Sequence, residues 1–419
     1  MAIAGLGGFS VQGDQLTDRP LLVRRVLWLL LIVTLASAAL VGVEIALTYA
    51  GSRGLLVEPG RPFGDDFINL WTVALLVKDG AFDAIYLHTA FEQFQQTLTG
   101  EYMGDRLWAY PPHSLFFTAP FAYLSYLLSF LLWTGLGLAV LAGGARRLGF
   151  GWLETAIIVF SPAAMLCVVH GQSGNLVAGL LLIALSGDGR SVRGPALAAA
   201  LLTVKPQAGF LLPVLWLIQR RWALIVTTSL LALGLMGLSA ALFGLSTWKD
   251  YAGDTLPALS SLEWEGWGAF LYMIPSVFIS MRLLDFTAES AFGAHVLFAG
   301  IVFAALLWRL VVVKDAQRRV ILVLAATCLI TPYLHVYDMT ILLAASLLLI
   351  RALGRASQSA TWLAIVALIV SWLLPRLVMP LGAMGLPLSP LLILAVFAIA
   401  CFLTRDDAGQ SLSKDRQIA

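Results

Sequence analysis

The chain has 419 residues, of which 60% are hydrophobic and only 12% are charged. Soluble domains carry about 25% charged residues, so this composition excludes a soluble globular protein and indicates an integral membrane protein. The formal net charge of +2 gives no reason to expect a nucleic-acid partner.

Long apolar runs follow one another through most of the chain. They do not alternate apolar and polar residues, as the strands of a membrane barrel do, so we interpret them as helices. The fold class is therefore an all-α polytopic membrane protein with about twelve transmembrane helices, although several runs fall short of the ~20 residues that a full span needs. The runs lie approximately at 26–48, 114–145, 152–169, 173–186, 195–208, 209–219, 223–245, 292–313, 319–333, 337–351, 361–375 and 386–403.

The basic residues predict the orientation of these helices. Arg19, Arg24 and Arg25 precede the first run, which places the N-terminus in the cytoplasm under the positive-inside rule. This run is too long for a removable signal peptide and is expected to stay as an anchor. The later basic clusters can all be cytoplasmic only if 112–147 crosses the membrane a net single time. Pro120 then ends a short half-helix, and a longer membrane-spanning helix follows it.

This topology gives one transmembrane domain between two short tails. The predicted parts are a cytoplasmic tail 1–25, a membrane domain 26–404 with outer loops 51–111 and 246–291, and a cytoplasmic tail 405–419. Within the first outer loop, 67–77 is predicted as a short helix and 82–98 as an amphipathic helix. Such helices lie in the membrane interface.

Two adjacent acids, Asp65 and Asp66, stand before the first of these interfacial helices. An acid near a helix N-terminus is favourable by about 0.3 to 1 kcal/mol, so a helix cap is one interpretation. An acid at the membrane rim is also suited to general base catalysis, and the two roles can be divided between the neighbours.

Further polar residues fall at the outer ends of distant apolar runs. Ionisable groups beside membrane spans are costly and commonly mark a functional cavity, although each alone is explained by a snorkelling side chain. The predicted cluster comprises His113, His170 with Gln172 and Asn175, Lys205 with Gln207, and His335 with Tyr337 and Asp338. In the second outer loop, Glu263 lies beside Trp264. Tryptophan in such a loop usually belongs to the aromatic belt at the membrane interface, although an aromatic ring can also pack against a sugar.

Other kinds of site find little support in the chain. There is no phosphate-binding loop, dinucleotide fingerprint or nucleophile elbow. Cys167, Cys328 and Cys401 are far apart and lie in apolar runs, which favours neither disulfides nor zinc. We expect no cofactor and no metal ion.

Several short motifs, in this order along the chain, resemble those of glycosyltransferase family 87, whose members belong to the GT-C superfamily. The resemblance runs from about residue 60 to residue 340 and rests on order and spacing rather than on any single motif. The motifs are Gly64-Asp65-Asp66-Phe67, Trp108-Ala109-Tyr110-Pro111-Pro112, Gly171-Gln172-Ser173-Gly174-Asn175, Lys205-Pro206-Gln207 with Arg220-Arg221-Trp222, and Thr331-Pro332-Tyr333-Leu334-His335-Val336-Tyr337-Asp338.

The resemblance implies a polyprenyl-phosphate-mannose-dependent mannosyltransferase. It implies a GT-C-like fold, metal-independent inverting transfer to a glycolipid or polysaccharide, and a site facing the periplasm of a bacterial inner membrane. Asp66 would be the catalytic base, with Asp65 as second choice. The donor phosphate and sugar would be bound by Lys205, His335, Gln207, Tyr110, Gln172, Tyr337, Asp338 and His113.

Two other classes of function are open at this point. A transporter or flippase would recognise the same lipid-linked sugar without chemistry, but paired broken helices in matching halves, which such carriers show, are not evident. A structural scaffold would leave the outer polar cluster unexplained.

Overall fold

The computed structural model describes residues 21–187, 191–266, 269–353 and 357–404. Most of the predicted tails, at 1–20 and 405–419, therefore lies outside the described residues, as do Arg190 and Arg355 of the predicted basic loops. Within the described ranges the chain is mostly helical, and its only sheet is an antiparallel pair of short strands, β1 (Leu56–Glu58) and β2 (Arg61–Pro62).

Five helices of the described chain are long and apolar enough to cross a membrane, or up to six if a bent pair is counted as one span. They are α1 (Leu21–Gly51), α6 (Tyr126–Arg147), α13 (Trp222–Phe243), α18 (Ala288–Val312) and α21 (Gln358–Ala383). The bent pair, α7 (Trp152–Val159) and α8 (Pro162–Val169), meets at 44°. The class of polytopic membrane protein is thus supported, and the count of about twelve crossings stays a prediction.

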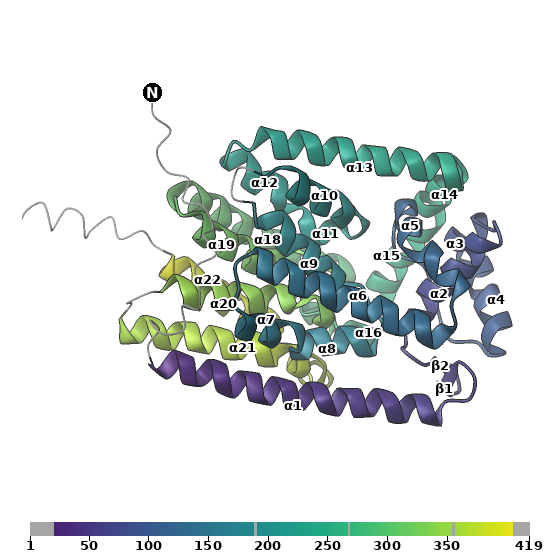
Figure 1. The fold of residues 1–419 in the computed structure, drawn as a ribbon, viewed down its shortest axis with the longest axis horizontal. Coiled ribbons are helices and arrows are strands. Elements are labelled where there is room, and N and C mark those ends of the chain that lie inside the picture. The colour runs from purple at the N-terminus through teal and green to yellow at the C-terminus, as the bar shows by residue number, and fades with distance from the viewer. Residues whose placement is uncertain (1–20, 188–190, 267–268, 354–356, 405–419) are drawn as a thin grey trace, which may run out of the picture.

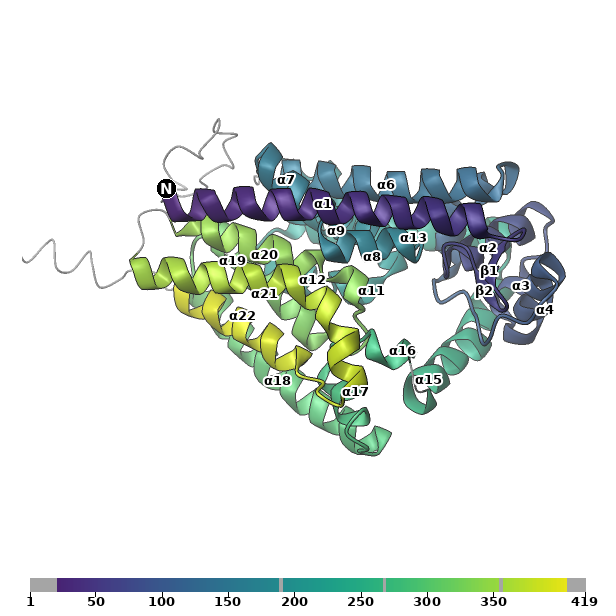
Figure 2. The ribbon, with the colours of Figure 1, turned by 90° about the horizontal axis from the view of Figure 1, so that it is seen from below.

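The other helices are shorter. They are η2 (Pro112–Ser114), α5 (Leu115–Thr118), η3 (Ala119–Tyr123), α9 (Gly174–Leu185), α10 (Arg193–Leu201), η4 (Leu202–Val204), α11 (Pro206–Gly209), α12 (Leu211–Ile218), α14 (Leu245–Asp250), η5 (Tyr251–Thr255), α15 (Leu256–Glu265), α16 (Ala269–Tyr272), α17 (Val277–Arg282), α19 (Ala316–Ile330), η6 (Val336–Asp338), α20 (Thr340–Ala352) and α22 (Ser389–Leu403). Some of them, such as α14 and α15, lie at the end of the molecule that carries the hairpin (Figure 1 and Figure 2).

Among the long helices, α1, α6 and α13 lie roughly along one axis in Figure 1, whereas α18 is tilted against α1 in Figure 2. Figure 1 shows α1 and α13 beginning at one end, where α6 finishes. Basic pairs stand at these helix ends: Arg24 and Arg25 in the first turns of α1, Arg146 and Arg147 in the last turn of α6, and Arg220 and Arg221 before α13. The opposite end carries the hairpin and the first outer loop, as the view from below also shows (Figure 2).

The first outer loop folds into the helices that its sequence predicts. The segment 67–77 is α2 (Phe67–Lys78), and the segment 82–98 is divided into α3 (Asp83–Tyr86) and α4 (His88–Thr99). Gln95 of α4 donates hydrogen bonds to the Asn69 and Thr72 side chains of α2, at 2.8 Å and 3.4 Å. This contact fixes α4 against the helix that follows the aspartate pair.

The segment 112–147 has the predicted short piece before a longer helix. η2, α5 and η3 precede α6, and the Ser125 hydroxyl accepts a hydrogen bond from the Leu128 amide as the N-cap of α6. α6 then crosses α9 in direct backbone contact, because a Cβ built on Gly144 would lie 2.4 Å from the Gly179 carbonyl oxygen. Small residues at such crossings let membrane helices approach closely, and α9 begins at Gly174, within the motif Gly171–Asn175.

Candidate functional site

The aspartate pair lies in a tight turn between the hairpin and α2. Gly64 and Asp65 both have positive φ angles, of 71° and 49°, so the chain passes through the left-handed region twice before α2 begins. Asp tolerates this conformation better than most residues. Asp66 occupies the N-cap position of α2, but its side chain makes no capping hydrogen bond. The Asp66 carboxylate is therefore directed to other partners.

Arg106 joins the two carboxylates. Its Nη1 lies 2.9 Å from Oδ1 of Asp66, and its Nη2 lies 3.1 Å from Oδ1 of Asp65. The Nε atom donates to the Met103 carbonyl oxygen at 3.2 Å, which ties the guanidinium to its own loop. Sequence reasoning missed Arg106. The signal that could have identified Arg106 is a single cation two residues before the Trp108–Pro112 motif, in a loop where, of the charged residues, only the acidic ones were considered as site candidates.

The second oxygen of each carboxylate contacts the turn at His170–Gln172, which leads into α9. Nδ1 of His170 lies 2.8 Å from Oδ2 of Asp65, and the Gln172 amide donates to Oδ2 of Asp66 at 2.6 Å. Both partners follow α8 in a sharp turn at Gly171, whose φ is +58°. A Cβ at Gly171 would lie 2.4 Å from the Cβ of Phe67, so only glycine lets this turn sit against the start of α2.

The same turn connects to the Tyr-Pro-Pro motif. The Tyr110 hydroxyl lies 2.7 Å from the Ser173 hydroxyl and 3.4 Å from Oε1 of Gln172. Gln172 therefore uses one end of its amide for Asp66 and the other for Tyr110. Trp108 and Ser114, on either side of Tyr110, are joined by a 3.0 Å hydrogen bond from the indole nitrogen to the hydroxyl, which closes the loop around the tyrosine.

A second charged centre lies on the other side of the Gly171–Asn175 turn. A Cβ at Gly174 would lie 2.5 Å from the Tyr337 carbonyl oxygen and 3.0 Å from Oδ1 of Asp338. Both Asp338 oxygens lie 2.7 Å from Nζ of Lys205, and both residues are buried, at 2% and 7% exposure. Lys205 is thus already neutralised by a buried partner, which is the usual condition for a buried charge.

His335 and Tyr337 stack beside this ion pair. Their ring centroids are 4.9 Å apart with an interplanar angle of 8°, and Nζ of Lys205 lies 5.3 Å from the Tyr337 ring centroid. The His335 backbone amide donates to Asp338 at 3.2 Å. Among the described residues, Nδ1 of His335 is buried and has no hydrogen-bond partner.

The last two predicted residues stand further from the pair. His113 is buried, with its Nε2 3.0 Å from the Thr203 hydroxyl and its ring stacked on Trp248 at 5.9 Å. Gln207 contributes its backbone carbonyl, which accepts a hydrogen bond from Thr331. Contacts therefore link Asp65, Asp66 and Tyr110 to the Gly171–Asn175 turn, and that turn to Asp338 and Lys205.

The two aspartates differ in their electrostatic surroundings. Partial burial alone would raise the pKa of Asp65, but the His170 hydrogen bond and the Arg106 charge outweigh it and lower the pKa to about 2. For Asp66, burial and the adjacent Asp65 charge raise the pKa against the opposing effects of Arg106 and Gln172. Both side chains keep about a third of their surface exposed, 32% for Asp65 and 38% for Asp66. Asp66 is thus the more basic of two accessible carboxylates.

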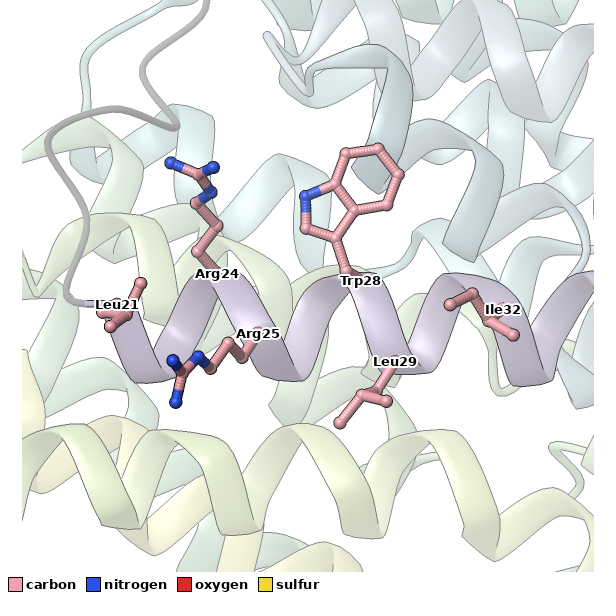
Figure 3. A pocket seen from close by; sticks show the side chains of 6 residues that line it. All are labelled: Leu21, Arg24, Arg25, Trp28, Leu29 and Ile32. Atoms are coloured by element: carbon pink, nitrogen blue, oxygen red, sulfur yellow. The ribbon is translucent and has the colours of Figure 1, made fainter.

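Two other features of the described chain stand apart from this network. His88, Glu92 and Asp105 place their potential ligand atoms within 4.8 Å of one another, on α4 and the loop that follows. A groove of about 490 Å³ runs along the first turns of α1, lined by Arg24, Arg25, Trp28, Ile32 and two leucines (Figure 3). This groove lies at the basic end of the molecule, whereas the aspartate pair precedes α2 at the opposite end (Figure 2).

Comparison with known proteins identifies the family. No curated protein and no solved structure matches the chain. The family model of glycosyltransferase family 87 matches residues 108–332, which is more than half of the chain. This match contains the Tyr-Pro-Pro, Gly171–Asn175 and Lys-Pro-Gln motifs and confirms the family resemblance over these residues. The Gly64–Phe67 motif, with Asp65 and Asp66, and residues 333–338 of the last motif lie outside the match. The chain belongs to glycosyltransferase family 87.

Proposed function

We propose that this protein transfers a hexose, mannose first among the candidates, from a polyprenyl-phosphate-linked donor to a hydroxyl of a glycolipid or polysaccharide. Membership of a glycosyltransferase family supports the reaction class. The apolar helices support donor and acceptor substrates at a membrane. A polyprenyl tail stays in lipid and holds its sugar at the interface, within reach of an acid at the helix rim.

In this proposal the chain is one GT-C-like membrane domain, 26–404, with about twelve crossings, in a bacterial inner membrane. The basic pairs at one end, Arg24 with Arg25, Arg146 with Arg147 and Arg220 with Arg221, support cytoplasmic termini, with the loops 51–111 and 246–291 in the periplasm. The aspartate pair, at the other end, then faces the periplasm.

Asp66 is the proposed general base. It accepts the proton of the acceptor hydroxyl while that oxygen attacks the anomeric carbon, and the polyprenyl phosphate leaves from the opposite face, so the configuration inverts. One carboxylate suffices, because a phosphate leaving group needs no strong acid and no metal ion takes part in the proposed step. The observation that carries this assignment is an accessible carboxylate, 38% exposed, held by Arg106 and Gln172 rather than by the helix that it precedes.

The donor phosphate is proposed to lie between the two centres. His335 offers its unpartnered Nδ1, and Lys205, whose charge is shared with Asp338, is proposed as the second phosphate contact beside the Tyr337 ring. Tyr110, Gln172, Tyr337 and Asp338 belong to the contacts around Asp66 and Lys205 and are proposed to position sugar and phosphate oxygens. His113 and Gln207 complete the outer part of the proposed binding site.

The test is transfer of labelled sugar from a synthetic polyprenyl-phosphate hexose by purified protein in lipid vesicles. Asp66→Asn is expected to abolish formation of the labelled product, whereas Asp65→Asn is expected to have the smaller effect. Asn matches the shape of Asp and is also tolerated at the left-handed position 65. Full activity of Asp66→Asn would exclude it as the base, and movement of unchanged donor across the bilayer without product would identify a carrier instead.

A further inference from the structure

Arg106 makes an unusual contact with the aspartate pair. A guanidinium commonly grips one carboxylate with two parallel hydrogen bonds. Here Nη1 and Nη2 each take one oxygen from a different aspartate, at 2.9 Å and 3.1 Å. The Arg106 side chain is only 14% exposed, and its third donor, Nε, is held by the Met103 carbonyl oxygen. The guanidinium is therefore fixed in place and bridges the two acids.

The bridge separates two groups that would otherwise be near-equivalent. Adjacent carboxylates repel each other, and a pair that shares one site commonly retains a proton between them. A single cation bonded to both offsets part of that repulsion, although the Asp65 charge still raises the pKa of Asp66. What then distinguishes the two acids is the partner of each remaining oxygen, which is the His170 ring for Asp65 and the neutral Gln172 amide for Asp66.

The wider surroundings of Asp66 add little positive charge. The titratable groups that act on it are Asp65 beside it, Arg106 from the loop before Tyr110, and His170 from the turn after α8. Tyr126 of α6 and Tyr337 of η6 are also within electrostatic reach of its carboxylate. Arg106 is thus the one fixed cation among the groups that face Asp66 in the described structure.

We propose that Arg106 is a positioning residue that, together with His170 on Asp65 and Gln172 on Asp66, divides the aspartate pair into an ionised spectator, Asp65, and a proton acceptor, Asp66. This inference rests on the proposed function. Arg106 does so without touching the substrate: it holds both carboxylates in one geometry and sets how readily Asp66 takes a proton. Lysine cannot replace it, because a single ammonium is a compact point charge without the planar fork that reaches two acids at fixed separation.

The experiment measures the pH dependence of kcat/KM for four variants in the vesicle assay. Activity requires ionised Asp66, so it rises with pH through the Asp66 pKa. Arg106→Gln removes the cation and is expected to move this rise by about one pH unit or more to higher pH. Asp65→Asn removes the like charge and is expected to move it to lower pH. A general loss of structural integrity would not shift the profile in opposite directions.

Arg106→Lys is the variant that keeps the charge. Its profile is expected to stay within about half a pH unit of wild type while kcat falls at least about tenfold, because one ammonium cannot hold both carboxylates in register. Arg61→Gln is the matched control. Arg61 lies in the same outer loop, is 58% exposed, and pairs only loosely with Glu58, at 4.0 Å. Its removal is expected to leave both the profile and kcat unchanged.

A second readout does not depend on activity. Infrared difference titration of protein labelled with ¹³C-aspartate follows protonation of the carboxylates directly, and the band that is missing in Asp66→Asn assigns Asp66. This band is expected to titrate at higher pH in Arg106→Gln than in wild type, even if that variant is inactive. Arg106→Met, which also removes the cation, provides a second variant if the glutamine protein does not fold.

The outcomes separate this inference from the proposed function. If wild type transfers sugar but neither the profile nor the Asp66 band moves in Arg106→Gln, Arg106 does not set the basicity of Asp66 and the inference is overturned, while the transferase assignment stands. If Asp66→Asn keeps full activity, the base assignment fails. The infrared titration then still shows whether Arg106 divides the pair.

Discussion

The buried ion pair of Lys205 and Asp338 allows a quantitative test of the second charged centre. Both Asp338 oxygens lie 2.7 Å from the Lys205 ammonium, and the two side chains are only 3% and 9% exposed. Removing one partner of such a pair leaves the other charge buried and uncompensated, which costs about 3–5 kcal/mol, whereas replacing both by neutral groups of similar volume is often neutral or stabilising.

The perturbation is a double-mutant cycle of Lys205→Met and Asp338→Asn. Each single variant is expected to lower the free energy of unfolding by about 3–5 kcal/mol. Methionine keeps most of the lysine stem, and asparagine keeps an oxygen that can accept the His335 amide, which Asp338 accepts now. The double variant is therefore expected to lose less stability than either single variant.

The assay is reversible unfolding in mixed micelles, followed by tryptophan fluorescence and by circular dichroism. Lys249→Met, at an exposed lysine of α14, is the control and is expected to change stability by no more than about 0.5 kcal/mol. Additive losses, with the double variant equal to the sum of the singles, would refute the reasoning. So would single variants as stable as the control, because they would mean that Lys205 and Asp338 are not buried against each other.

Two further predictions concern helix packing and pH. Gly144→Ala is expected to lower the thermal unfolding temperature, because the added Cβ would lie 2.4 Å from the Gly179 carbonyl oxygen. The control Gly143→Ala, whose added Cβ has no atom within 4 Å, is expected to leave this temperature unchanged or to raise it. Equal shifts in the two variants would argue against the α6–α9 contact. Burial of Glu263 raises its pKa to about 8 from 4.5, so the folded state retains a proton that the unfolded state releases. The free energy of unfolding is then expected to fall as pH rises from about 4.5 to 8. When unfolding is measured across that range, this fall should be smaller in Glu263→Gln. Identical dependence of the unfolding free energy on pH in the two proteins would contradict the burial of Glu263.

The sequence predicts helix positions well because apolar runs and their boundaries are local features. The two interfacial helices and the interrupted segment before α6 follow from Pro120, glycine and apolar spacing. Membrane crossings are harder to predict, because many helices such as α9 and α12 are shorter than a full span. Their place in the molecule depends on tertiary packing rather than on length.

For the site, too, the local sequence predicts which residues take part but not which of them contact each other. The order of the motifs predicts that Asp66, Gln172, Lys205 and Asp338 belong to one site. The structure connects these residues through the Gly171–Asn175 turn. The partner of each charge was not predictable, because pairing across a hundred residues is set by the fold. Lys205 was expected to be free for a phosphate, yet its ammonium is bonded to Asp338, and Arg106 was not singled out at all.

The left-handed backbone of Asp65 limits how this site can vary among related sequences. Only glycine, asparagine and aspartate hold such a conformation without a cost of about 1–2 kcal/mol. Of these three, aspartate alone is charged. Substitution of Asp65 by glutamate or serine therefore introduces backbone strain. Substitution by glycine or asparagine avoids this strain but removes the negative charge beside Asp66. Backbone shape thus couples the residue choice at one position to the acidity of its neighbour.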